Sequence, residues 1–157
     1  MSRAAEVDRR TKETDVRVAL MLDGDGAGQR ETGVGFLDHM LDLLARHGHF
    51  DLSVAATVPM DEARAACAID VSGRGLCVFE ASLPPGSIGN FDHELTEEFF
   101  RALASNAKLT LHLTVQAGTN VHHVIEAVFK AFARALRAAV AIDPTERGVP
   151  STKGTLV

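Results

Sequence analysis

The sequence predicts an α+β fold with two similar halves, each a mostly antiparallel sheet with helices packed on one face. Two observations carry this prediction. Short apolar strands alternate along the chain with segments whose apolar residues recur at helical spacing. In addition, a shift of 59 residues places residues 39–45 on residues 98–104 and residues 50–54 on residues 109–113, each time a helix followed by a strand. The sequence therefore reads as two copies of one strand–strand–helix–strand–helix unit.

The first half, residues 9–56, begins with a predicted strand and continues into a helix. Residues 16–22 are apolar and β-branched, and the Asp-Gly-Asp-Gly that follows is typical of a turn. From Gly35 onward the apolar residues recur at helical spacing, which predicts a helix. Residues 50–55 alternate between apolar and polar side chains and predict a second strand.

The second half, residues 57–143, ends with the clearest helix of the chain. Asn120 belongs to a residue type that caps helices, and residues 121–136 carry one continuous apolar stripe. Residues 147–157 contain Gly, Pro, Ser and Thr and are predicted to form a C-terminal loop. At this length, residues 1–157 are expected to form a single domain.

Further elements are predicted earlier in the second half. Ser72-Gly73-Arg74 is a turn sequence between two apolar segments, so these segments are predicted to form a hairpin. Phe99, Phe100 and Leu103 recur at helical spacing. The predicted elements are strands at 65–71 and 75–81, a helix at 96–107 and a strand at 109–115.

The first half has no counterpart of the long helix that ends the second half. Glu98 and Val140 are 42 positions apart, whereas His39 and Ala56 are only 17 positions apart. If the halves are equivalent, at least 25 residues, a helix included, are missing between Ala56 and Thr57. Either the sequence joins two segments across residues that belong to the protein, or the protein lacks them. A true loss would expose a large apolar patch.

Composition excludes several classes of protein. The chain has 16 Lys and Arg against 21 Asp and Glu, a net charge of −5, which argues against a nucleic-acid partner. No run of 18 apolar residues exists, so no membrane span is expected. Residues 1–12 contain no apolar core of a secretory signal, and two cysteines cannot form a disulfide framework. We therefore expect a protein of the reducing cytoplasm.

A candidate metal site lies at the start of the long helix, in His122-His123-Val-Ile-Glu126. His122 and Glu126 share one helix face, whereas His123 points about 100° around the axis, so the two imidazoles can serve two different ions. Imidazole and carboxylate ligands suit Mn, Fe or Zn. His39 lies within an apolar helical segment, and its repeat partner is Glu98, so both are further candidate ligands.

Each of these residues also has an ordinary structural interpretation. A pair of histidines after a helix cap is often only a surface feature, and a lone histidine in an apolar helix is more often structural than ligating. Lys130 lies one turn beyond Glu126; it is either a solvated helix lysine or a cation placed for an anionic substrate.

Two loops contain residue types that bind phosphate. Ser72-Gly73-Arg74 and Pro150-Ser151-Thr152-Lys153-Gly154 each combine a hydroxyl, a glycine and a cation, although either could be an ordinary turn. Glu13 and Glu62 are equivalent under a shift of 49 residues, and each opens an apolar strand, where exposed carboxylates are common. Gly24, Gly26 and Gly28 are not followed by Lys-Ser or Lys-Thr, which makes a kinase with a Walker loop improbable.

Together these residues resemble the imidazoleglycerol-phosphate dehydratase family, the manganese enzymes of histidine biosynthesis. The similar stretches occur in the family's order from about residue 9 to residue 156, nearly the whole chain. They are Arg10-Thr-Lys-Glu-Thr14, Thr32-Gly-Val-Gly-Phe-Leu-Asp-His-Met-Leu41, Pro59-Met-Asp-Glu-Ala63, Asp70-Val-Ser-Gly-Arg74, His122-His-Val-Ile-Glu-Ala127, Phe129-Lys-Ala131 and Val149-Pro-Ser-Thr-Lys-Gly154.

The resemblance implies a hydro-lyase that removes water from imidazole glycerol phosphate to give imidazole acetol phosphate. It also implies a duplicated ribosomal-protein-S5-domain-2-like unit, two Mn²⁺ ions per active site and no organic cofactor. The expected partners are a phosphorylated small molecule and further copies of the chain, which assemble into a cubic shell of 24 subunits with active sites between subunits.

The resemblance also implies roles for individual residues of this sequence. Glu98 occupies a position where some family members have a ligand histidine. The carboxylates expected to take part in proton transfer are Glu13, on the substrate side, and Glu126. The implied metal ligands are His39, Glu98, His122, His123 and Glu126, and the implied phosphate-binding residues are Arg74, Ser151 and Lys153, assisted by Lys130.

The sequence departs from the family pattern in one respect. The first His-His-x-x-Glu-Asp motif, its helix and the Arg-Phe-Gly strand after it are absent between Ala56 and Thr57, where the repeat predicts missing residues. This motif should supply about half of the metal ligands, so the activity of the 157 residues is in question. The alternative function is a non-catalytic relative that keeps the shell-forming fold and phosphate binding.

Overall fold

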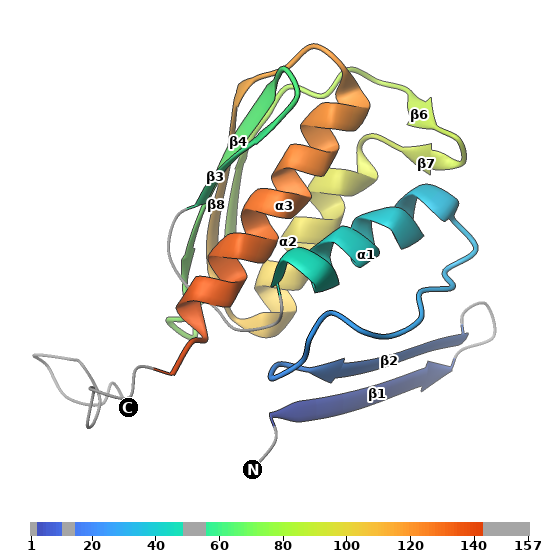
Figure 1. Ribbon diagram of the computed structural model, residues 1–157, viewed down its shortest axis with the longest axis vertical. Helices are drawn as coiled ribbons and strands as arrows, with labels where there is room; N and C mark the ends of the chain where they lie inside the picture. The colour runs from blue at the N-terminus through green and yellow to red at the C-terminus, as the bar shows by residue number, and fades with distance from the viewer. Residues whose placement is uncertain (1–2, 11–14, 49–55, 143–157) are drawn as a thin grey trace, which may run out of the picture.

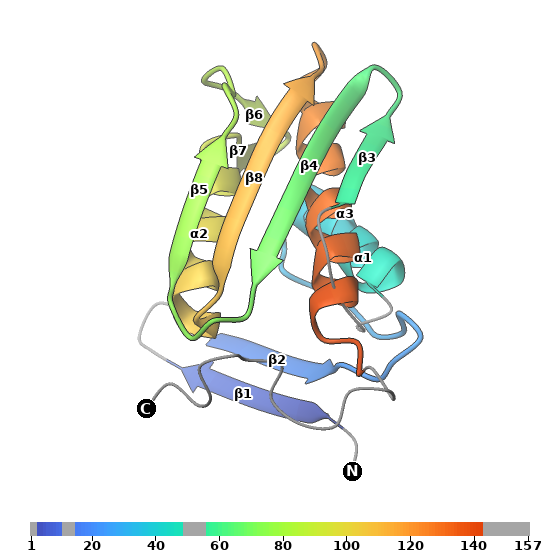
Figure 2. The same cartoon turned by 90° about the vertical axis from the view of Figure 1, so that its left-hand side faces the viewer.

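The second half of the chain forms a complete sheet with two helices on one face. The structure is a computed structural model, and it describes residues 3–10, 15–48 and 56–142. Figure 2 shows the central sheet, in which the strands lie in the order β3-β4-β8-β5. The strands are β3 (Ala56–Met60), β4 (Ala63–Asp70), β8 (Thr110–Ala117) and β5 (Leu76–Glu80).

The helices lie on one side of this sheet. Helices α2 (Leu95–Ala107) and α3 (Val121–Ala139) cover the same sheet face, and α1 (Gly35–Gly48) lies against α3 on the side away from the sheet (Figure 1). A short pair, β6 (Ser87–Ile88) with β7 (Phe91–Asp92), precedes α2. No helix in the described residues is long and apolar enough to cross a membrane.

The first half contributes a separate hairpin. Strands β1 (Ala4–Arg10) and β2 (Asp15–Met21) pair antiparallel with each other and form their own two-stranded sheet. In Figure 1 this hairpin lies below the helices and the central sheet. The strand at β2 and the helix at α1 confirm two sequence predictions, whereas β1 lies in a charged segment for which no strand was predicted.

The predicted hairpin across Ser72-Gly73-Arg74 is wrong. β4 and β5 do not pair with each other, because β8 lies between them, antiparallel to β4 and parallel to β5. The connection of five residues is long enough to step past one strand, since neighbouring strands lie only about 5 Å apart. The true hairpin is β3–β4, whose two-residue turn is Asp61-Glu62. Asp61 adopts a φ of 48°, a left-handed conformation that Asp tolerates.

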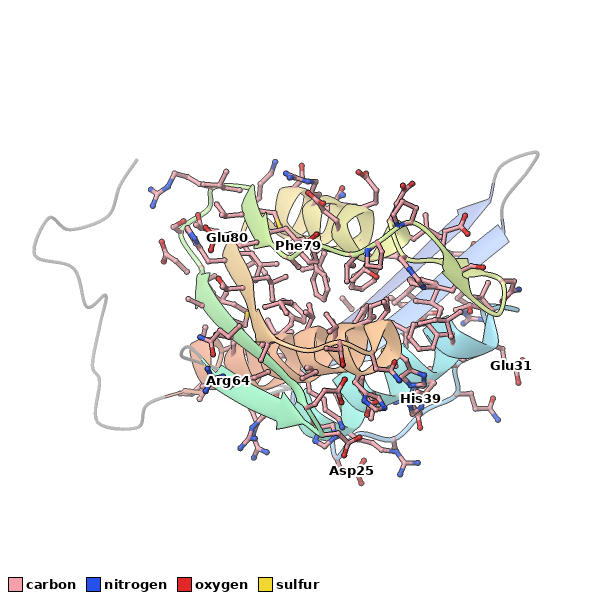
Figure 3. All side chains as sticks on the ribbon, turned by 90° about the horizontal axis from the view of Figure 1, so that it is seen from above. Asp25, Glu31, His39, Arg64, Phe79 and Glu80 are labelled. Carbon is pink, nitrogen blue, oxygen red and sulfur yellow. The ribbon has the colours of Figure 1, made fainter. Side chains whose placement is uncertain are left out.

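The buried face of the sheet carries small residues where α3 approaches it. Along β4, the alternating Ala63, Ala65 and Cys67 are buried, and the helix presents its own buried alanines to this layer. Figure 3 shows Phe79 on the sheet, and its ring stacks on Phe100 of α2. Around them the core is completed by Leu111, Leu113, Ile125, Val128, Phe129 and Phe132.

The two cysteines of the chain lie in the interior of the central sheet. Cys67 and Cys77 lie on different strands of the central sheet, and both are free and buried. Burial raises the pKa of both thiols. Neither cysteine therefore has the exposed, acidic character of a reactive thiol.

The α+β class is confirmed, and the halves are unequal. The central sheet of the second half is antiparallel except for the parallel pairing of β5 with β8. Among the residues that the structure describes, the first half supplies only β1, β2 and α1. The predicted strand at 50–55 and the loop at 147–157 lie outside the described residues. Ala56 and Thr57 are consecutive residues of β3.

Candidate metal site and its surroundings

The candidate site is organised by the N-terminus of α3. Asn120 has an extended backbone, and its side-chain Oδ1 accepts a hydrogen bond of 2.9 Å from the backbone N–H of His122. This is the N-cap contact predicted from the sequence. Gly118 precedes it with a φ of 142°, and a Cβ there would lie 2.5 Å from the Val124 side chain. The turn from β8 into α3 therefore requires a glycine. This turn fixes where α3 starts, and thereby the positions of His122 and His123 in its first turn.

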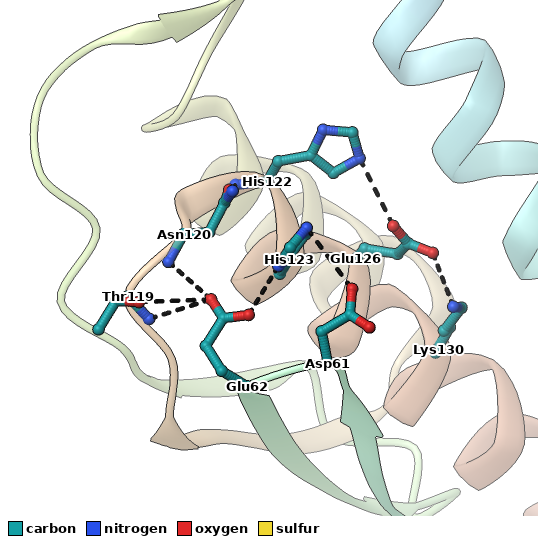
Figure 4. A network of polar contacts seen from close by, with 8 residues as sticks. All are labelled: Asp61, Glu62, Thr119, Asn120, His122, His123, Glu126 and Lys130. Carbon is teal, nitrogen blue, oxygen red and sulfur yellow. Dashed lines mark hydrogen bonds and ion pairs between the residues drawn. The ribbon is translucent and has the colours of Figure 1, made fainter.

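His39, His122 and Glu126 converge between two helices. Figure 3 shows His39 on α1, and the packing of α1 on α3 brings it to the two residues of α3. One potential ligand atom from each of the three residues lies within 4.8 Å of the other two. The His122 Nε2 atom lies 3.5 Å from Glu126 Oε2 (Figure 4). Two imidazoles and a carboxylate at this spacing fit a divalent ion such as Mn²⁺, Fe²⁺ or Zn²⁺.

Glu126 is the buried member of this cluster. Its side chain is only 7% exposed. Its Oε1 atom lies 2.6 Å from the Nζ atom of Lys130, with which it forms an ion pair. Because a buried carboxylate needs a partner, Lys130 compensates its charge while the other oxygen faces His122. Phe36 packs edge-on against the His122 ring at 5.1 Å and restricts its orientation.

His123 points to a different group of residues. Its Nδ1 atom lies 2.7 Å from Glu62 Oε2, and its Nε2 atom lies 3.6 Å from Asp61 Oδ2. Both carboxylates belong to the tight turn between β3 and β4 (Figure 4). The predicted separation of the two imidazoles is thus present: His122 belongs to the cluster with His39, and His123 lies beside the turn.

The ionisation of this turn follows from its hydrogen bonds. The contact with His123 and the backbone N–H of Asn120 lower the pKa of Glu62 to about 2. In return, the Glu62 carboxylate raises the pKa of His123 above the usual imidazole value, and the charges of Asp61 and Glu126 act in the same direction.

Two predicted site residues lie away from this cluster within one chain. Arg74 lies in the exposed connection after β4 and pairs with Asp70 at 3.5 Å. The Glu62 turn lies at the opposite end of β4, and eight residues of strand span about 23 Å. Glu98 is exposed on α2 and is not among the described residues that converge with His39.

Three predicted residues cannot be placed. Glu13, Ser151 and Lys153 lie outside the described residues, so their proximity to the cluster remains a prediction.

Sequence reasoning missed two contributions to the site. Glu62 was considered only as a strand start, and Asp61 and Phe36 only as members of the stretches that resemble the family. A signal was available for Glu62, because the 49-residue shift aligns it with the candidate acid–base residue Glu13. Its contact with His123 depends on the distant hairpin meeting α3, which local patterns do not reveal.

Comparison with known proteins gives a consistent family. The sequence model of the family described as imidazoleglycerol-phosphate dehydratase matches residues 32–58 and 54–136. The dehydratase of Symbiobacterium thermophilum is 47% identical over 193 residues, which cover 98% of this chain and 93% of the relative. The dehydratase of Methanoculleus marisnigri is also 47% identical over 193 residues, covering 98% of this chain and all of the relative.

Solved structures agree with the sequence relatives. The dehydratase of Staphylococcus aureus N315 superposes with a TM-score of 0.79 at 33% identity, covering 89% of this chain and 99% of the other. The enzyme of Pyrococcus furiosus in complex with (S)-C348 gives a TM-score of 0.78 at 27% identity, covering 96% of this chain and all of the other.

The same comparisons show that the aligned relatives are longer than this chain. Both alignments with the bacterial and archaeal relatives span 193 positions, at least 36 more than the 157 residues of this chain. The family match divides into two parts that meet at residues 54–58, which include the Ala56–Thr57 junction. With a family match on both sides of that junction and close relatives over almost its full length, the chain belongs to the imidazoleglycerol-phosphate dehydratase family.

Proposed function

We propose that this chain carries one part of the active site of a metal-dependent dehydratase that converts imidazole glycerol phosphate to imidazole acetol phosphate in histidine biosynthesis. The observation that carries the proposal is the convergence of His39, His122 and Glu126 within 4.8 Å. A pair of adjacent histidines on a surface helix would not require a third ligand from another helix, whereas a metal site does.

The proposed division of roles follows the geometry. His39, His122 and Glu126 would hold one Mn²⁺ ion, and His123 would contribute to a second ion, with Glu98 as a further ligand. Bound divalent ions would supply positive charge that stabilises the negative charge developing on the substrate's imidazole ring as water leaves. Lys130 holds the Glu126 carboxylate in place through its 2.6 Å ion pair.

Proton transfer and phosphate binding complete the proposal. The carbon that loses its proton has no adjacent carbonyl, so a positioned carboxylate is needed as base; the candidates are Glu13 and Glu126. Arg74, Ser151 and Lys153 are proposed to bind the substrate phosphate. No organic cofactor is required for this reaction.

The position of Arg74 favours active sites shared between copies. It lies about one strand length from the His122 end of the sheet, too far for both to contact one small substrate. We therefore propose that Arg74 serves a site on another copy of the chain, in an assembly such as the 24-subunit shell expected from the family resemblance.

A non-catalytic relative is the second candidate, and the missing segment favours it. At least 36 aligned positions of the relatives have no counterpart in this chain, and the resemblance puts half of the metal ligands among them. Such a protein would keep the fold and phosphate binding without turnover.

One pair of proteins distinguishes the two candidates. The experiment measures bound Mn²⁺ and the formation of imidazole acetol phosphate for the 157-residue chain. The same measurements are made on a variant that carries the Symbiobacterium segment between Ala56 and Thr57. The dehydratase proposal predicts turnover in the variant with the inserted segment, and loss of it in the same variant with His122→Ala. A folded insertion variant that binds no metal would overturn the proposal and support the non-catalytic role.

A further inference from the structure

Glu62 accepts hydrogen bonds from the residues that begin α3 and also contacts His123. Its Oε1 atom lies 2.8 Å from the backbone nitrogen of Asn120, and weaker contacts of 3.4 and 3.5 Å come from the backbone nitrogen and hydroxyl of Thr119. Its Oε2 atom lies 2.7 Å from Nδ1 of His123. One carboxylate therefore bridges the turn between β3 and β4, the cap of α3 and the second histidine (Figure 4).

The Glu62 carboxylate determines which nitrogen of His123 carries a proton. A carboxylate that is ionised at neutral pH has no proton to donate, so both of its oxygens only accept hydrogen bonds. The 2.7 Å contact is then a hydrogen bond only if Nδ1 of His123 is the donor. In the neutral ring this leaves Nε2 as the nitrogen with a free electron pair, and a metal ligand needs that pair.

We infer that Glu62 is a positioning residue, which holds His123 in its Nδ1–H form and presents Nε2 as the ligand atom. A carboxylate behind a histidine has this effect in metal sites generally, where it fixes both the ring orientation and the tautomer. The ligand role of His123 rests on the proposed function, whereas the tautomer does not.

A carboxylate of this length is specifically required at position 62. A glutamine would have one acceptor oxygen and one amide that donates, so with its oxygen on the Asn120 N–H it could bond His123 only as a donor, which requires an unprotonated Nδ1. The neighbouring Asp61 cannot take over, because it faces the other ring nitrogen at 3.6 Å. Glu62→Gln keeps the size of the side chain and removes the requirement for an Nδ1–H donor on His123.

The first test reads the tautomer directly in the metal-free full chain. Ring ¹⁵N chemical shifts of His123 are measured by NMR at a pH where imidazole is neutral. The wild type is expected to show the Nδ1–H form, and Glu62→Gln is expected to lose that preference. An Nε2–H ring in the wild-type protein would overturn the inference, whether or not the variant folds.

Asn120→Ala is the matched control for this test. It removes the side-chain cap of α3 but keeps the Asn120 backbone N–H and the Glu62–His123 contact. If Glu62 acts only by stabilising the helix end, both variants should alter the His123 tautomer alike, and the inference fails. A change in Glu62→Gln alone supports it.

The second test links the tautomer to metal binding. Mn²⁺ is titrated into the metal-free wild type, His123→Ala and Glu62→Gln. Glu62→Gln is expected to lower the affinity for the Mn²⁺ ion that His123 binds by about 10- to 100-fold. If His123→Ala weakens Mn²⁺ binding and Glu62→Gln does not, positioning is excluded. If His123→Ala has no effect either, the ligand role in the proposed function is wrong, and the NMR result alone decides the role of Glu62.

Discussion

The hairpin β1–β2 and the hairpin β3–β4 open the two halves of the chain, but only the second is part of a larger sheet. Adding 49 to the residue numbers of β2 gives 64–70, which is almost the range of β4. β4 pairs on its second edge with β8, and α3 covers its inner face. β1 and β2 pair only with each other among the described strands.

The difference is visible in the exposure of side chains on the two hairpins. Val7 and Val18 face each other across the first hairpin and are 60% and 53% exposed, whereas Ala65 and Cys67 of β4 are buried. A two-stranded hairpin without a third strand or a helix is marginal in water. Of the elements of the first half that the structure describes, α1 packs on the second half, against α3.

The largest expected effect is a difference in stability between variants of the two halves. Phe100 is completely buried on α2 and contacts Phe129 and Phe132, so Phe100→Ala should lower the free energy of unfolding by about 3–5 kcal/mol. Val18→Ala on β2 should change it by no more than about 0.5 kcal/mol, because the side chain is exposed. Urea unfolding followed by circular dichroism measures both.

The unfolding result for Val18→Ala tests whether the first hairpin belongs to the folded core. If Val18→Ala costs as much as a core truncation, then β1–β2 is covered by another part of the protein, such as a second copy. A protein diluted below its assembly concentration would then lose that sensitivity.

The next effect concerns the start of α3. Asn120→Ala removes the hydrogen bond from the His122 N–H to the cap side chain and should destabilise the protein by about 1 kcal/mol. Asn120→Asp keeps an acceptor oxygen and should stay close to the wild type. If Asn120→Ala leaves the unfolding midpoint unchanged, the helix end is not coupled to the global stability of the second half.

Local patterns predicted the elements of the second half better than their arrangement. The helices α2 and α3 and the strand β8 agree with their predicted ranges, because apolar periodicity and the Asn120 cap are local signals. The pairing of strands is not local. β4 and β5 are neighbours in sequence with a turn between them, yet β8, which follows 30 residues after β5, inserts between them.

The candidate site shows the same limit. The i, i+4 spacing predicted that His122 and Glu126 share a face, and the repeat suggested His39 as a companion; the three do converge. The spacing also predicted that His123 points away from His122. It did not predict which residues His123 contacts, because the Glu62 turn is 61 residues away in sequence. Arg74 and Glu98 were also predicted as site residues, and within one chain they lie away from this cluster.

A smaller effect depends on pH, because Glu62 and His123 are partly exposed and solvent screens their interaction. The folded-state pKa of Glu62 lies at about 2, below the unfolded value of 4.5. Its contribution to stability is therefore present above pH 4.5 and lost as the pH falls toward 2. His123, whose pKa is raised beside Glu62, Asp61 and Glu126, contributes below its unfolded value of 6.5 and loses this contribution as the pH rises through its folded value.

Unfolding curves between pH 2 and 9 for the wild type and Glu62→Gln measure this dependence. The difference in stability between the two proteins should shrink below pH 4.5 and above the folded-state pKa of His123. A difference that stays constant across the series would show that the Glu62 carboxylate and His123 are not coupled in solution.

The smallest effect tests how the first hairpin is held to the rest of the molecule. The Arg3 guanidinium donates a 2.7 Å hydrogen bond to the carbonyl of Val140, the C-cap of α3, and forms an ion pair with Asp23. A cation beside the unpaired carbonyls of a helix end is favourable, but a partly exposed contact is worth only about 0–1 kcal/mol. Arg3→Ala should therefore barely change global unfolding, whereas hydrogen exchange of the β1–β2 amides should become faster. Asp23→Ala, which keeps the contact with Val140, should accelerate exchange less. If neither variant changes exchange in the hairpin, Arg3 does not anchor it, and the contrast between the two hairpins rests on strand pairing alone.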